Sequence, residues 1–338
     1  MRSIDSSKSS AWGRLLGYVL SGVILLGSAQ AWAATPLKVA YSSIAGVTAV
    51  PWIAVERGIF AKYGIDVELI YLAGSQPMQS LLGGTTPIVL QGIEPVINTN
   101  AQGADTVMIG GLVNTAVFSL VVRPEIKELK DLKGRPLGIT RYGSSTDFVL
   151  RYALEKWGLK PDYDVPILQM GGVPPILVGM ETKKIYGGPL SLPTLARATQ
   201  AGFREIIDLS DVIPAYQVTG VVARRSFIKD QEEVVRSFLK GITEAIAVFK
   251  NDAAYTKKIL QEKIKIQDRI ILEETYKRYS RYISRVPYPT RPGIALIKTT
   301  LEEKNPAIRK LSIDDLIDTR FVRELEQSGF IDALYRPR

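Results

Sequence analysis

The chain has 338 residues, of which 46% are apolar and 23% charged, and a formal net charge of +9. This composition is typical of an ordinary globular protein of about two domains. The sequence contains no Cys and no His, which excludes disulfides, thiolate nucleophiles, Cys- or His-ligated metals and a Ser-His-Asp triad. We therefore predict no cofactor, no metal and no catalytic residue.

The N-terminal segment is typical of a secretory signal peptide. Basic residues Arg2, Lys8 and Arg14 precede an apolar stretch, residues 15–26, and the segment closes on small residues at 31–33. We predict cleavage near Ala33, since Ala31-Trp32-Ala33 fits the A-x-A pattern. An uncleaved anchor is the alternative, because the segment is long enough to approach a membrane span. No Cys follows for a lipid anchor, so we expect a periplasmic protein from a Gram-negative source.

Nucleic acid is the obvious candidate partner for a basic chain, but export argues against it. The basic residues of the C-terminal third alternate with acids at helical spacing. That pattern is typical of a solvated helix face. We therefore predict no nucleic-acid partner.

The first block of the mature chain alternates strands with helices. Strand patterns cover 37–41, 66–71, 87–91, 106–110 and 117–123, and helical patterns cover 51–63, 75–82 and 94–102. Short β-branched runs between turn residues predict strands, and their alternation with helices predicts a largely parallel sheet.

A second block repeats this alternation, and a helical segment follows it. Strands are predicted at 136–140, 165–170, 204–209 and 218–223, with helices at 129–133, 145–157, 174–182 and 192–201. From 227 to 303 the pattern is almost entirely helical, with an apolar stripe over 228–250 and a last short helix at 321–327. Because this helical segment has no sheet of its own, its apolar stripe must be buried against another part of the chain.

These patterns predict an α/β protein of two lobes. Residues 34–124 form the first part of lobe one, 125–216 form lobe two, and 217–338 return to lobe one. The C-terminal helices then pack on lobe one. We expect the chain to cross between the lobes near 123–127 and near 215–220.

Four segments in this order resemble one family of binding proteins: residues 51–68, 130–139, 143–147 and 201–209. The chain is similar to the NMT1/THI5-like periplasmic substrate-binding proteins of ABC importers, which include binding proteins for sulfonates, taurine, nitrate and thiamine-pyrimidine precursors. The resemblance implies the type 2 periplasmic-binding-protein fold, two hinge crossovers, a membrane permease as partner, and a monomer. The family's fungal enzymes need a histidine and a cysteine-rich motif, so their activity is not implied.

One segment departs from the family pattern. Residues 185–189 read Ile-Tyr-Gly-Gly-Pro where the family commonly has a Val-Asp-Ala-type turn near the ligand. The floor of the pocket is therefore expected to differ from that of other members.

Ligands of open α/β sheets bind outside the carboxyl ends of the strands. In a two-lobed protein this places the pocket in the cleft. The candidate ligand-binding residues are Ser43, Gly74, Ser75, Gln91, Arg141, Tyr142, Ser144, Ser145, Pro189, Ser191, Tyr216 and Thr219.

Two predicted helix N-termini, at Gly74-Ser75 and at 143–147, indicate an anionic ligand, because free N–H groups and the helix dipole favour negative charge. The alternative is that Ser144 is only an N-cap, with Asp147 completing a capping box. Arg141 either pairs with the anion or lies at the rim in water. Glu94 opposes an anion if it lines the cleft, so it points outward, pairs with a base, or meets a cationic ligand.

We therefore predict a protein that captures a small organic anion between two lobes and delivers it to an ABC-type importer. An aromatic ligand is the second choice, suggested by Trp52, Tyr142 and Tyr216. A sensory protein that presents its ligand to a membrane receptor is the first alternative function. An enzyme on the same fold is the second, and the sequence offers no recognisable acid–base motif for it.

Overall fold

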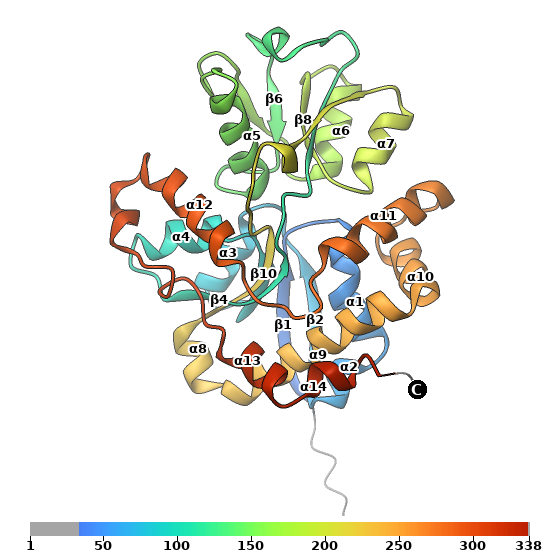
Figure 1. Ribbon diagram of the computed structural model, residues 1–338, viewed down its shortest axis with the longest axis vertical. Coiled ribbons are helices and arrows are strands. Elements are labelled where there is room, and N and C mark those ends of the chain that lie inside the picture. The colour runs from blue at the N-terminus through green and yellow to red at the C-terminus, as the bar shows by residue number, and fades with distance from the viewer. Residues whose placement is uncertain (1–33, 337–338) are drawn as a thin grey trace, which may run out of the picture. The chain divides into compact units, whose positions relative to one another are not determined.

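The computed structural model describes residues 34–336, and the predicted signal peptide, residues 1–33, lies outside them. Two five-stranded sheets, each flanked by helices, form the two lobes (Figure 1). The predicted two-lobed α/β fold is confirmed. No helix of the described part combines the length and the apolar character needed to cross a bilayer.

The sheet of lobe one has the strand order β2-β1-β3-β10-β4. Its strands are β1 (Thr35–Tyr41), β2 (Ile65–Tyr71), β3 (Ile88–Gln91), β4 (Thr106–Val113) and β10 (Thr219–Arg224). β1 pairs in parallel with β2 and β3, while β10 runs antiparallel between β3 and β4. Every residue of β4 is buried, which explains its continuous apolar run.

The sheet of lobe two has the equivalent order β7-β6-β8-β5-β9. Its strands are β5 (Ser119–Val122), β6 (Leu137–Ile139), β7 (Ile167–Gln169), β8 (Gly187–Leu190) and β9 (Arg204–Asp208). β5 is the antiparallel strand here, between β8 and β9. Each sheet is therefore mostly parallel, with one antiparallel strand.

The predicted turn at 185–189 is wrong, because residues 187–190 form the buried strand β8 in the middle of this sheet. A Cβ on Gly187 would overlap the Val121 carbonyl, and one on Gly188 would overlap the Gly138 carbonyl. Glycine at these positions lets neighbouring backbones approach closely. A Gly-Gly-Pro sequence that is typical of a turn is here a consequence of tight strand packing.

The first crossing between the lobes lies earlier than predicted. The strand expected in lobe one at 117–123 is β5, which pairs with β8 and β9 of lobe two. The chain therefore crosses between Val113 and Ser119, not near 123–127. It returns between Asp208 and Thr219.

Helices flank both faces of each sheet (Figure 1). In lobe one they are the 3-10 turn Gly46–Thr48, α1 (Ala49–Glu56), α2 (Ile59–Lys62), α3 (Gln76–Leu82) and α4 (Glu94–Asn100). In lobe two they are the 3-10 turns Leu129–Leu132 and Leu209–Asp211, α5 (Ser145–Lys156), α6 (Val173–Glu181) and α7 (Thr194–Gln200). The single helix predicted over 51–63 is broken at Gly58, whose φ of +63° is left-handed.

The C-terminal helices pack on lobe one, as predicted. They are α8 (Arg225–Asp230), α9 (Glu232–Asn251), α10 (Ala253–Lys263), α11 (Arg269–Tyr282), α12 (Arg291–Glu302), the 3-10 turn Pro306–Lys310, α13 (Arg320–Gln327) and α14 (Phe330–Ala333). The apolar stripe of α9 is buried, and its Phe238 ring stacks on Phe60 of α2 with 5.1 Å between centroids. Burial of such rings supplies much of the stability of the packing.

Candidate functional site

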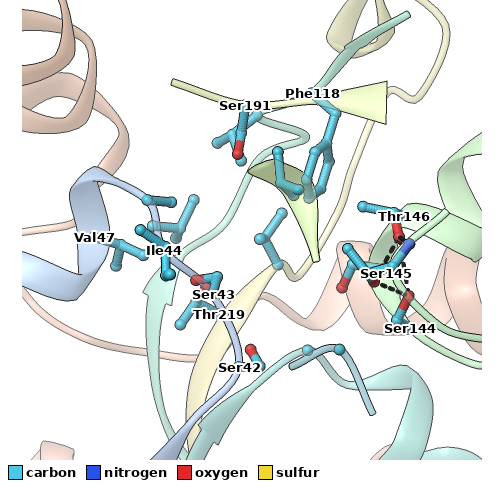
Figure 2. A pocket seen from close by; sticks show the side chains of 18 of the residues that line it. Ser42, Ser43, Ile44, Val47, Phe118, Ser144, Ser145, Thr146, Ser191 and Thr219 are labelled. Atoms are coloured by element: carbon cyan, nitrogen blue, oxygen red, sulfur yellow. Dashed lines mark hydrogen bonds between the residues drawn. The ribbon is translucent and has the colours of Figure 1, made fainter. Parts of the chain in front are cut away.

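A cavity lies where the two lobes meet, at the carboxyl ends of β1, β2, β3 and β6. We call it the interlobe cavity. The empty space within it, with the open solvent at its mouth included, is about 670 Å³. Figure 2 shows side chains of lobe one, lobe two and the crossing segments around this space.

Most of the polar lining is hydroxyl. The hydroxyl groups come from Ser42, Ser43, Thr140, Ser144, Ser145, Thr146, Ser191, Thr219 and the phenols Tyr71 and Tyr279. The apolar lining comes from Ile44, Ala45, Val47, Pro95, Val113, Val117, Phe118, Val173 and Val218. Such a mixture suits a small organic molecule with an apolar body and a few hydrogen-bonding groups.

Three hydroxyls of lobe two form a closed cluster beside the cavity (Figure 2). Thr140 Oγ1 lies 2.8 Å from both Ser144 Oγ and Thr146 Oγ1, and the last two lie 3.0 Å apart. The backbone N–H of Thr140 donates to Thr146 Oγ1 at 2.9 Å. Because these groups satisfy one another, the cluster holds the turn between β6 and α5 in one shape.

The N-terminus of α5 reaches the cavity through Ser144, Ser145 and Thr146. Ser144 has the extended backbone of an N-cap, but its hydroxyl donates to the Arg141 carbonyl at 2.7 Å instead of capping the helix. Asp147 accepts the N–H of Gly143 at 2.9 Å. In a capping box it would accept the N–H of the N-cap residue, Ser144. The predicted capping box is therefore wrong, and a carboxylate of the chain already lies at this helix end.

A second carboxyl, Glu94, meets the same helix end from lobe one. Ser145 Oγ donates to Glu94 Oε2 at 3.1 Å, and the Tyr216 hydroxyl donates to Glu94 Oε1. Glu94 is 1% exposed, and burial raises its pKa to about 7 against the lowering effect of these hydrogen bonds. The three residues belong to α4, α5 and the returning crossing segment, so they join both lobes.

Glu94 also lines a second depression, which we call the outer hollow. This depression encloses about 680 Å³ between α5 and the end of α12, open solvent included. Its walls carry the charged residues Asp147, Arg151, Glu155 and Lys304. Glu94 therefore lies in the wall that the two depressions share.

The interlobe cavity contrasts with the outer hollow in charge. Among the described residues that line the cavity there is no Lys and no Arg, and Glu94 is the sole carboxylic acid. The buried Tyr279 hydroxyl makes no well-aligned hydrogen bond within residues 34–336, although Ser191 and the backbone of Gly46 lie near it, and burial raises its pKa. Such a group gains a hydrogen bond when a polar ligand enters.

The structure brings part of the predicted site together. Ser43, Gly74, Ser144, Ser145, Ser191 and Thr219 all line the interlobe cavity. These residues follow strands or crossing segments whose ends meet in the cleft, as the position of sites in parallel sheets requires.

The other predicted residues lie outside the lining. Ser75 bonds the Tyr142 carbonyl across the lobes at 3.1 Å, and the Tyr142 ring is half exposed, with its hydroxyl on the Ile167 carbonyl. Tyr216 is fully buried behind Glu94. Pro189 lies within the central strand β8, where it opposes Leu120.

Gln91 and Arg141 also lie outside the lining. The side-chain amide of Gln91 is buried, and neither its nitrogen nor its oxygen has a hydrogen-bond partner in the described part of the chain. Arg141 packs on the opposite lobe, because a Cβ on Gly74 would lie 3.1 Å from the Arg141 Cβ. Arg141 therefore contributes to the contact between the lobes, and neither side chain is part of the cavity wall.

Sequence reasoning missed several lining residues. Val117 and Phe118 belong to the first crossing, which was placed too late in the chain. Tyr279 comes from α11, and only the packing of the C-terminal helices brings it to the cavity. Tyr71 is the last residue of β2, so the rule that ligands bind at the ends of strands could have found it.

Comparison with known proteins places this chain among binding proteins. The family model described as NMT1/THI5 like matches residues 48–254. YtlA of Bacillus subtilis is 25% identical over 334 residues, covering 93% of this chain and 98% of that protein.

Solved structures share the fold. A protein of Bordetella bronchiseptica superposes with a TM-score of 0.78 at 19% identity, covering 87% of this chain and 98% of that one. The alkanesulfonate-binding protein SsuA of Xanthomonas axonopodis pv. citri superposes with a TM-score of 0.69 at 17% identity, covering 82% and 94%.

Proposed function

This chain belongs to the NMT1/THI5-like family, and we propose that it is a periplasmic solute-binding protein that captures a small organic molecule between its lobes and delivers it to an ABC-type importer. One observation carries the proposal: the interlobe cavity is lined by residues of both lobes and of both crossing segments. A ligand there contacts both lobes at once, so its binding favours the conformation in which they approach.

Movement about the two crossing segments is the mechanism of capture. These segments, 114–118 and 209–218, are the connections between the two sheets, and hinge residues typically lie in such connections. Closure buries the ligand, and the importer recognises the closed form. The lobes are 34–113 with 219–336, and 119–208, which replaces the boundaries predicted from sequence.

The predicted anionic ligand depends on two helix ends, and the lining of the cavity supports it weakly. α3 contributes no residue to the lining, and the N-terminus of α5 already meets Asp147 and Glu94. The alkanesulfonate ligand of the Xanthomonas neighbour belongs to that protein, and at 17% identity only the fold is shared.

A thermal-shift screen tests the capture step. Sulfonates, carboxylates, nitrate, amides, amines and pyrimidines are each added to the protein, and a bound compound raises the Tm by mass action. We expect at least one class to raise it. Val117→Phe narrows the cavity and should abolish the shift, whereas Val178→Phe, exposed on α6 outside the cavity, should retain it.

Scattering tests closure. The radius of gyration should fall when a compound that raises the Tm is added to the wild-type protein. An unchanged profile would contradict closure but not binding. No shift with any compound class would contradict the proposed function. A sensory role predicts the same binding and closure but requires a receptor in place of a permease, so co-purification with the membrane partner separates the two.

A further inference from the structure

The geometry points to Glu94 as the residue that selects the charge of the ligand: the interlobe cavity accepts uncharged or cationic molecules that carry an N–H donor and rejects anions. This inference rests on the proposed function, since it concerns the ligand of the same cavity. It opposes the anion predicted from the sequence.

Few charged groups line the interlobe cavity. The lining, as far as the structure describes it, includes the carboxyl of Glu94 and no Lys or Arg. A buried anion needs a charged or strongly hydrogen-bonding partner, because leaving water costs several kcal/mol. The hydroxyls of Thr140, Ser144 and Thr146 already bond one another.

Carboxyl groups of the chain lie beside the N-terminus of α5. Anions bind helix N-termini because unpaired N–H groups and the dipole attract negative charge. Glu94 accepts a hydrogen bond from Ser145 Oγ in the cavity wall, whereas Asp147, on the side of the outer hollow, accepts the Gly143 N–H just before the helix and pairs with Arg151. An anion that approached this helix end from the cavity would therefore meet the Glu94 carboxyl.

The groups around Glu94 donate hydrogen bonds to it or pair with other acids. Tyr216 of the crossing segment and Ser145 of α5 donate hydrogen bonds to it. Two nearby bases are paired with other acids: Arg151 bonds Asp147 at 2.6 Å and Asp162 at 2.6 Å, and Lys304 bonds Glu155 at 2.6 Å. Arg141, on the loop before α5, packs on Gly74 near Tyr71, and its buried Nε has no hydrogen-bond partner within residues 34–336. Tyr71 and Tyr279, the phenols of the cavity, are uncharged at neutral pH. Among the described residues, no base forms an ion pair with Glu94.

Each carboxylate oxygen can accept more than one hydrogen bond. Glu94 can therefore keep its bonds to Tyr216 and Ser145 and still accept an N–H from a ligand in the cavity. A cationic ligand gains most when Glu94 is ionised, and an uncharged amide gains a hydrogen bond in either state.

Isosteric probes of different charge test this selection. Benzoate, benzamide and benzamidine share one frame, as do acetate, acetamide and acetamidine. Binding of all of them is measured by calorimetry and by Tm at about pH 8. We expect the amide and amidine of at least one frame to bind at least about tenfold more tightly than the carboxylate.

The matched variants are Glu94→Gln and Glu155→Gln, which remove the same charge from the shared wall and from the exposed side of the outer hollow. Glu94→Gln should weaken the amidine about tenfold and leave the amide within about threefold. Glu155→Gln should leave the order of the probes unchanged. In the wild type, amidine affinity should rise as the pH passes through about 7, where Glu94 ionises.

Two results would overturn the inference. One is tighter binding of the carboxylate than of its amide and amidine. The other is an unchanged order of affinities in Glu94→Gln, above all if Arg141→Gln alone weakens the carboxylate. If no probe, sulfonate or nitrate binds at all, the proposed function itself fails, and the charge inference with it.

Discussion

The interlobe cavity and the outer hollow share a wall, yet their charged groups are arranged in opposite ways. In the outer hollow, acids and bases are paired: Arg151 with Asp147, and Lys304 with Glu155. In the cavity, hydroxyls and apolar groups surround a carboxyl that has no base beside it. The comparison teaches that polar groups without a charged partner, and not paired charges, distinguish the candidate binding site.

Glu94 connects the two, because it lies in their shared wall. Its hydrogen bonds to Tyr216 and Ser145 join the lobes across buried groups. In the outer hollow the Lys304–Glu155 pair joins the lobes through partly exposed groups, whereas Arg151 and Asp147 both lie on α5. If this distinction is correct, changes in the shared wall should have larger effects than changes in the outer hollow.

The largest expected effect is that of Glu94→Gln on the pH dependence of stability. The folded-state pKa of Glu94, about 7, exceeds its ordinary value of 4.5, so the folded protein holds this proton more tightly than the unfolded chain. Its contribution is complete below about pH 4.5 and is lost as the pH rises through 7. We expect the wild type to lose roughly 3 kcal/mol over this interval relative to the variant.

Urea unfolding of both proteins at several pH values between about 4 and 8 measures this difference. Other carboxyls, such as Asp105, whose pKa is lowered to about 2, contribute equally to both proteins and cancel. A constant difference between wild type and variant across the interval would contradict the buried, unneutralised carboxyl.

Gly92→Ala is the next change, and it acts on the contact itself. A Cβ at Gly92 would overlap Glu94 Oε2 and Ser145 Oγ, and it would lie 3.1 Å from the Val218 carbonyl. The added methyl must push the lobes apart at this point, so we expect a loss of about 1–3 kcal/mol in the free energy of unfolding. Chemical denaturation measures it.

Gly83→Ala is the matched control. Gly83 is exposed at the end of α3, and the nearest atom to its Cβ, the Gln79 carbonyl oxygen, lies 3.2 Å away. It should change stability by less than about 1 kcal/mol. Equal losses in the two variants would mean that the lobes can separate slightly at Gly92 without loss of stability. The contact between Glu94 and Ser145 would then contribute little to the free energy of unfolding.

The alternation of strands and helices could be predicted from sequence because each element carries its own periodicity. Ser43, Gly74 and Ser144 could be placed in the cleft for the same reason, since they follow predicted strands. Strand β8 could not, because its Gly-Gly-Pro sequence reflects close neighbours in three dimensions and matches a turn locally.

The sequence also could not predict which charged side chain lines the cavity. The positions of Glu94 and Arg141 along the chain say nothing of which one faces the cavity, and the rotation of α4 and of the loop before α5 decides this. Tyr279 lies far along the chain from every other lining residue, and tertiary packing of α11 alone places it there.

Arg151→Met tests the pairing inside the outer hollow. Arg151 is 21% exposed and contacts Asp147 and Asp162, each at 2.6 Å. Its removal leaves Asp147, which is 11% exposed, with only the Gly143 N–H as a partner. We expect a loss of about 1–2 kcal/mol by urea unfolding at neutral pH. A loss larger than that of Gly92→Ala would reverse the ranking of the two regions.

Lys304→Ala should have the smallest effect. The ion pair of Lys304 with Glu155 joins the segment after α12 to α5, but its side chains are 54% and 37% exposed. Solvent screens such pairs, and holding two long side chains in place costs entropy, so we expect a loss of at most about 0.5 kcal/mol that vanishes in high salt. Unfolding at low and high ionic strength measures it, with probe binding as a second readout that should not change. A loss above about 1.5 kcal/mol would show that exposed charge across the outer hollow, and not the buried contact at Glu94, holds the lobes together.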